Sequence, residues 1–225
     1  MKLNLPTVLS FTGGYVDTAG FLALNGLFTA HVTGNFVMIG AAVAHGSLGI
    51  IAKLLALPVF CIAIIFVRYV MLVIPATPRR TLLWMLILKF LFLAAGAIAA
   101  IHFGSFSDPD GWPLILTGML LVIAMAVQNA AHRIHLTSAP PSTLMTGTTT
   151  QIMIEVANLL HGVPTESGDS IRPRLVRLVI AVCAFALGCG FAALFYIQFG
   201  VWCFVVPPLL AVLALSTLVL EKEYA

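Results

Sequence analysis

The sequence predicts an all-α polytopic membrane protein with six transmembrane helices and two half-length re-entrant helices, arranged as an inverted internal repeat. Three observations predict this fold class: the composition, the lengths of the apolar segments, and a motif that occurs twice. Of the 225 residues, 61% are hydrophobic and 8% are charged, whereas a soluble domain carries about 25% charged residues. This composition excludes a soluble enzyme, a nucleic-acid-binding protein and a disordered chain, and it makes the lipid bilayer the main partner.

Six stretches are long enough to cross the hydrocarbon core of a bilayer, which is about 30 Å thick and needs about 20 apolar residues in a helix. In chain order they are residues 7–27, 50–75, 82–103, 112–132, 174–198 and 201–220. Two further apolar segments are too short to span the core. One reads TGNFVMIGAAVAHG, and the other, TGTTTQIMIEVANLLHG, is interrupted by polar and acidic side chains.

The two short segments resemble each other, and the similarity extends to the helix that precedes each of them. The first half reads YVDTAG…AHVTGNFVMIGAAVAHG, and the second reads AVQNAA…TLMTGTTTQIMIEVANLLHG. Asp17 thus corresponds to Gln128, and a Thr-Gly pair follows 16 residues later in the first half and 18 residues later in the second. We therefore predict one transmembrane domain made of two repeats, residues 1–105 and 111–221.

Basic residues decide the predicted topology, because Lys and Arg gather in short cytoplasmic loops. If both short segments spanned the bilayer, Lys2 and the cluster Arg172–Arg177 would fall outside. If both are re-entrant, every basic cluster is cytoplasmic, the loop with Asp108 and Asp110 faces outward, and only Lys53 is misplaced. Both termini are then cytoplasmic, and three spans per repeat invert the second repeat. Helices lying flat on the membrane surface are the rival interpretation, but neither segment has the Lys/Arg-rich side that such helices use.

Inverted repeats with broken helices bind solutes near the midplane, where non-helical backbone must be buried in protein or line a wet cavity. The two Thr-Gly pairs stand at the start of the short helices. The N-termini of these helices offer free N–H groups and partial positive charge, which suit a small polar or anionic solute. Ordinary capping by Thr and Asn is the alternative. The candidate solute-binding residues are Asp17, His31, Thr33, Gly34, Asn35, Gln128, Asn129, Thr146, Gly147, Thr148 and Gln151.

Two carboxylates are candidates for a proton relay. Asp17 lies near the middle of the first span, where a charge is costly and usually functional; its alternative role is a structural pair with a buried base such as Lys89. Glu155, in the second short helix, is either a relay or a salt-bridge partner of Arg68. His31 is a further proton-relay candidate, since its charge changes near neutral pH, or an ordinary hydrogen-bonded loop residue.

The sequence contains no motif of a hydrolase, a zinc site or a nucleotide-binding loop, so we expect no enzyme activity, no cofactor and no metal. We interpret the chain as a small-molecule permease, with proton coupling through Asp17 and Glu155 as the finer hypothesis. The alternatives are a passive channel, an accessory membrane subunit and a membrane-embedded enzyme that acts on lipid. Small residues in the later helices allow close packing and leave a homodimer open.

One long segment, FTGGYVDTAGFLALNGLFTAHVTGNFVMIGAA, together with VQNAAHR and MTGTTTQ in the second half, resembles the YoaK family of bacterial membrane proteins. The resemblance covers nearly the whole chain, and the family carries a domain of unknown function. It implies a multi-pass protein of the bacterial inner membrane with about six helices. It supplies no substrate and no catalytic residue.

Overall fold

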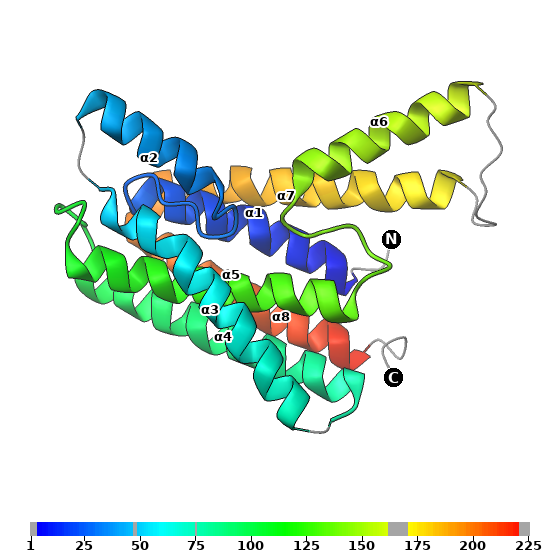
Figure 1. Cartoon of the computed structure of the whole chain (residues 1–225), viewed down its shortest axis with the longest axis horizontal. Helices are drawn as coiled ribbons and strands as arrows, with labels where there is room; N and C mark the ends of the chain where they lie inside the picture. Colours follow the sequence, from blue (N-terminus) through cyan, green and yellow to red (C-terminus); the bar gives the residue numbers. More distant parts are fainter. Residues whose placement is uncertain (1–3, 47–48, 75, 162–170, 221–225) are drawn as a thin grey trace.

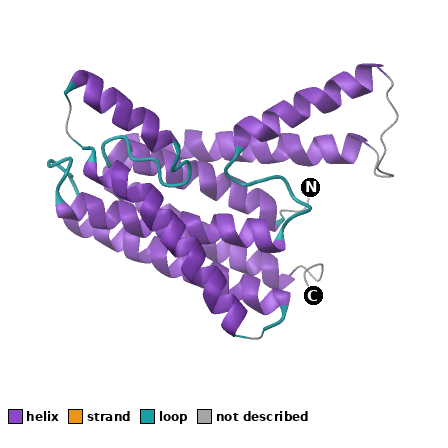
Figure 2. Cartoon of the chain, in the orientation of Figure 1, coloured by secondary structure: helices purple, strands orange, loops and turns teal. Residues whose placement is uncertain are grey.

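The structure is a computed structural model that describes residues 4–46, 49–74, 76–161 and 171–220, and the regular structure of these residues is entirely helical (Figure 2). In chain order, the helices are α1 (Leu5–Ala23), α2 (Gly34–His45), α3 (Ile51–Val73), α4 (Pro78–Phe103), α5 (Trp112–His135), α6 (Met145–His161), α7 (Ile171–Phe199), the 3₁₀ helix η1 (Gly200–Val205) and α8 (Val206–Leu220). The all-helical class predicted from the sequence is therefore confirmed for the described residues.

Helices α1, α4, α5, α7 and α8 run roughly along the long axis of the molecule, and α3 crosses α4 and α5 obliquely; these six helices form its body (Figure 1). Helix α5 packs against α3 and α4, and α1 packs against α7 and α8. The start of α1, the end of α5, the start of α7 and the end of α8 lie at one end of this body (Figure 1). We call this end the terminal end, and the other end the loop end.

Among the residues that the structure describes, four stretches are long and apolar enough to cross a membrane: Ile51–Val73, Pro78–Phe103, Trp112–His135 and Arg172–Leu220. The last contains α7 and α8, which the 3₁₀ helix η1 joins without a hydrophilic loop. The 19 residues of α1 are not among them, because Asp17 and several Gly, Ser and Thr residues lower their hydropathy. Apolar helices that could cross a membrane are thus present, and the count of six spans stays a prediction.

Capping side chains and prolines fix the starts of α1 and α4. The Oδ1 atom of Asn4 accepts a hydrogen bond from the backbone N–H of Thr7 at 3.1 Å, and the hydroxyl oxygen of Thr77 accepts one from the N–H of Arg80 at 3.4 Å. A proline follows each cap within the first turn, where its missing N–H costs nothing.

The two short helices leave the body obliquely and in opposite directions (Figure 1). Helix α2 begins beside the middle of the body and runs toward the loop end, packing against α3. Helix α6 also begins beside the middle but runs toward the terminal end, along α7. With 12 residues α2 is about 18 Å long, whereas the 17 residues of α6 reach about 25 Å. The second short helix is therefore longer than the predicted half-bilayer length.

Two glycines allow α1 and α7 to approach each other closely. A Cβ atom at Gly14 would lie 2.1 Å from the carbonyl oxygen of Phe185, and one at Gly188 would lie 2.1 Å from that of Phe11. No side chain fits at either position, so the two backbones touch directly. The predicted role of small residues in close packing is confirmed at Gly188, but a Cβ at Gly190 would meet nothing within 4 Å.

Lys53, the one basic residue that the predicted topology misplaces, makes its polar contacts at the loop end. This side chain is buried, and its Nζ donates to the carbonyl oxygens of Asn25 at 2.8 Å and Gly49 at 2.5 Å. The carboxylate of Asp110 accepts hydrogen bonds from the N–H groups of Gly49 at 2.9 Å and Ile51 at 3.0 Å. Asp110 thus caps α3 from the loop between α4 and α5, and these hydrogen bonds lower the pKa of its carboxyl group.

Candidate functional site

Asp17 holds the loop that connects α1 to α2. Its Oδ1 atom accepts hydrogen bonds from the backbone N–H groups of Thr29 at 2.8 Å, Ala30 at 2.7 Å and His31 at 3.3 Å. Its Oδ2 atom lies 2.9 Å from Nδ1 of His31. The residue is 4% exposed. The charge partner is therefore His31 and the backbone, and the alternative pairing with Lys89 is wrong.

Asn35 fixes the same loop from the α2 side. Its Oδ1 accepts from the backbone N–H of Phe28 at 2.9 Å, and its Nδ2 donates to the carbonyl oxygen of Phe28 at 2.8 Å. The hydroxyl of Thr33 makes no capping bond. The alternative interpretation, in which Thr33 and Asn35 cap α2, is thus wrong. The Asn35 amide bonds to the loop and not to the first turn of α2.

The start of α2 also differs from the prediction of free N–H groups. The amides of Gly34, Asn35 and Phe36 donate to the carbonyl oxygens of three residues of the preceding turn at 2.7, 3.2 and 3.2 Å. These three donors are occupied, so they do not form an anion site as the unsatisfied start of a helix would.

A cavity of about 640 Å³ lies over this loop, where α1, α2 and α7 meet. Its polar wall contains Asp17, His31 and Thr33 from the predicted set, together with Thr18. Its apolar wall contains Phe21, Phe28, Val37, Phe185 and Cys189, and Gly34 completes the lining. The ring of His31 meets the ring of Phe185 edge to face, with centroids 5.6 Å apart. The sequence motif does not indicate the α7 residues of the lining, Phe185 and Cys189, because they come from the opposite half of the chain.

The second half uses the same device with amide side chains in place of the carboxylate. Nε2 of Gln128 donates to the carbonyl oxygen of Leu9 at 2.9 Å and to the hydroxyl of Ser142 at 3.1 Å. The hydroxyl of Thr143 donates to Oδ1 of Asn129 at 2.7 Å. These loop residues lie 14 positions after their partners, the separation that also joins Asp17 to His31. Ser142 and Thr143 were not among the sequence candidates, although the repeat and this spacing could have identified them.

The remaining second-half candidates lie outside the cavity, whose described lining contains no residue of α5 or α6. Thr146 and Gly147 are exposed, and the hydroxyl of Thr148 donates to the carbonyl oxygen of Leu144 at 3.0 Å. Nε2 of Gln151 donates to Oε1 of Glu155 at 2.9 Å. The structure thus places four of the five first-half candidates in the lining of one cavity, with Asn35 bonded to the loop beside it, and leaves those of the second half along α5 and α6.

Glu155 pairs with α7. Its Oε1 atom lies 3.3 Å from Nη1 of Arg174, and its side chain is 4% exposed while that of Arg174 is 49% exposed. The predicted partner, Arg68, is therefore replaced by a residue of the next helix. Lys89 is fully buried in α4, and its Nζ atom has no hydrogen-bond partner among the described residues.

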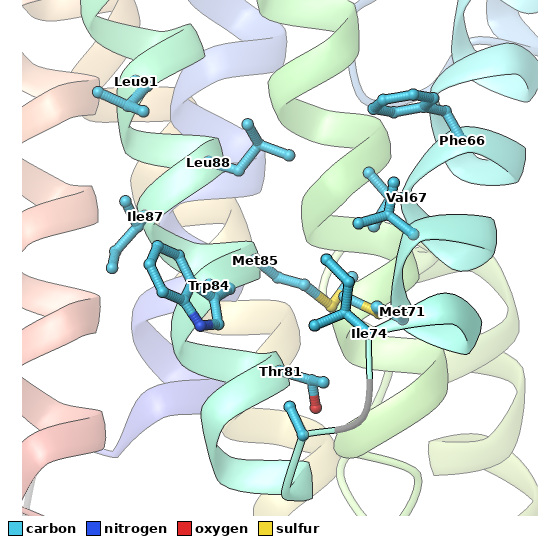
Figure 3. A pocket seen from close by; sticks show the side chains of 12 residues that line it. Phe66, Val67, Met71, Ile74, Thr81, Trp84, Met85, Ile87, Leu88 and Leu91 are labelled. Atoms are coloured by element: carbon cyan, nitrogen blue, oxygen red, sulfur yellow. The ribbon is translucent and has the colours of Figure 1, made fainter.

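A second cavity, of about 480 Å³, lies between α3 and α4 (Figure 3). Figure 3 shows Trp84, Met71 and Leu88 among the side chains that line it, and the hydroxyl of Thr81 is one of its few polar groups. A lining of this kind offers a polar solute almost no hydrogen bonds. We therefore place the candidate site at the Asp17 cavity.

Comparison with known proteins gives the family. The model of the family described as "Protein of unknown function (DUF1275)" matches residues 5–217. The UPF0700 transmembrane protein YoaK of Bacillus subtilis (strain 168) is 26% identical over 206 residues, which cover 88% of this chain and 87% of that protein. No solved structure matches. The chain belongs to the DUF1275 family and is a membrane protein, as the sequence resemblance indicated.

Proposed function

We propose that this member of the DUF1275 family is a small-molecule permease that binds its solute in the cavity beside Asp17 and His31. The observation that carries the proposal is that cavity. Its volume, about 640 Å³, falls within the range of about 300–1,000 Å³ that is usual for ligand sites. A buried carboxylate and an imidazole in the wall are typical of a transport pathway, because such groups are costly inside a membrane.

Two re-entrant segments entering from opposite membrane faces are part of the proposal. Each would consist of a loop, residues 24–33 or 136–144, and the helix that follows it. The loop backbone near Thr29 and Ser142 is buried in protein, as irregular backbone at membrane depth must be. The opposite directions of α2 and α6 and the shared 14-residue device favour an inverted repeat, with both termini in the cytoplasm of a bacterial cell.

The sequence suggested a small polar or an anionic solute, and the lining favours the polar one. Aromatic side chains, including Phe21 and Phe28, suit an apolar ring or chain, while Asp17, His31 and Thr33 suit hydrogen-bonding groups. An anion finds no free amide at the start of α2 and faces a carboxylate. We therefore favour a small polar solute with an apolar part and no net negative charge.

Asp17 would control whether the loop that leads into α2 is held or free during the transport cycle. Three loop amides share its Oδ1 atom, and such bonds are stronger when the acceptor is ionised. A proton that reaches Asp17, from His31 or from the cavity, weakens all three bonds at once and frees the loop that leads into α2. Solute binding and proton binding thereby act on the same contacts, which would couple solute transport to proton transport.

Uptake by purified protein in liposomes tests the proposal. We expect saturable uptake of at least one member of a panel of small polar metabolites, stimulated by a pH gradient. The Asp17→Asn variant should lose the stimulation, while Asp108→Asn, an exposed acid at the loop end, should keep it. No uptake of any solute by the natural chain would contradict the permease, and uptake that ignores the pH gradient would instead favour a passive channel.

A further inference from the structure

Polar atoms without partners follow one face of α5. Oε1 of Gln128, Nδ1 of His132 and Nε2 of His135 are buried and have no hydrogen-bond partner among the described residues. Their positions are related by steps of four and three residues, so the three side chains share one helix face over about 10 Å. The face begins beside the second-half loop and ends at the last residue of α5, at the terminal end of the body.

Lys89 of α4 brings a buried donor to the inner end of this face. A Cβ at Gly96 would contact Leu121, which fixes the register of the antiparallel helices α4 and α5. Seven residues, or two turns, separate Gly96 from Lys89 and Leu121 from Gln128, so Lys89 and Gln128 occupy the same level. The Nζ atom of Lys89 is buried without a partner, and Lys89 is 0% exposed. Among the described residues, five buried side-chain nitrogen or oxygen atoms have no hydrogen-bond partner. Four of them therefore belong to this face of α5 and the part of α4 opposite it.

The chemistry of these atoms is complementary. Nε2 of His132 lies 3.1 Å from the carbonyl oxygen of Ala139, an acceptor, so this nitrogen donates and Nδ1 of the neutral ring accepts. Lys89 supplies donors, while Gln128 Oε1 and His132 Nδ1 supply acceptors. Buried polar groups of native proteins are hydrogen-bonded, and those without a protein partner bind ordered water that bridges two to four of them.

We propose that a file of buried water molecules follows this face of α5 from His135 to Lys89 and Gln128. Neighbouring side chains at these spacings are about 5–6 Å apart at Cβ, a distance that one water molecule can bridge. The file would bring solvent from the terminal end to the amide that holds the second-half loop. The inference does not depend on the proposed transport, because it concerns where water binds and not what crosses the membrane.

Radiolytic labelling of the full chain in lipid nanodiscs, in ¹⁸O-labelled water, tests the file. Hydroxyl radicals form at bound water and modify the side chains beside it, even deep inside a protein. The reporters are His132 on α5 and Met85 on α4. The register of the two helices places Met85 at the same level as His132. The controls are Tyr15 and Phe204, which are as deeply buried but lie on α1 and η1. Each rate is divided by that of the same residue in the unfolded chain.

We expect normalised rates several-fold higher at Met85 and His132 than at the two controls. Equal rates at reporters and controls would overturn the proposal. His132→Phe and Lys89→Met each remove a polar atom of the file, so each should lower the rate at Met85 while the controls stay protected. An unchanged rate at Met85 in both folded variants would equally overturn it, and the two substitutions guard against one that fails to fold.

Discussion

Replacing Gly188 by Ala would force α1 and α7 apart. The added Cβ would lie 2.1 Å from the carbonyl oxygen of Phe11. A carbon–oxygen contact needs about 3.3 Å, so the helices have to separate by about 1 Å. Overpacking of this kind costs about 1–3 kcal/mol, which lowers the Tm of a chain of this length by roughly 2–12 °C. Far-UV circular dichroism of the purified protein in one detergent measures the change.

Gly190→Ala is the matched control on the same helix, because its Cβ would meet nothing within 4 Å. Both substitutions gain the same helix propensity, about 1 kcal/mol, so the difference between their Tm values isolates the contact with α1. Equal Tm values for the two variants would refute the close approach of the helices. Since α1 carries Asp17 and α7 carries Phe185, solute uptake should also fall in Gly188→Ala and persist in Gly190→Ala.

Three further substitutions test individual contacts of the fold. Asp110→Asn should melt a few degrees below the natural chain at neutral pH. Because its pKa is lowered, Asp110 stabilises the fold above about pH 4, and the gap should close as acid protonates it. Asn35→Ala removes two hydrogen bonds of a buried side chain, costs about 1–3 kcal/mol, and should speed amide exchange in residues 24–33; unchanged exchange there would contradict its role. Arg174→Met should destabilise the chain by about 1–3 kcal/mol, because Glu155 loses its cation, and adding Glu155→Gln should restore part of that loss.

Helix positions were predictable where length and hydropathy carry the signal. The predicted span 112–132 differs from α5 by three residues at one end, and the Thr-Gly pair of the first half marks the start of α2 at Gly34. In the second half α6 begins at Met145, ahead of its Thr-Gly pair. The two motifs are therefore similar in sequence without having the same position in their helices.

Partners of the buried charges were not predictable, because they depend on side-chain reach and on backbone donors. The sequence marked Asp17 as unusual, but its partners are mostly backbone amides of a loop, which no residue identity reveals. For Glu155, Arg68 and Arg174 were equally available by charge, and only the packing of α6 along α7 selects the second. Sequence patterns thus identify which groups need a partner, and the tertiary structure decides which partner they receive.

Helix α2 is attached to the body at its first residues. Asn35 bonds to Phe28, and Asp17 holds the loop that leads into the helix. At its other end, Ala44, His45 and Gly46 are exposed. A lever that is pivoted at one extremity travels farthest at the other. If the proposed site opens, the far end of α2 should therefore move most, while its start beside the cavity stays in place.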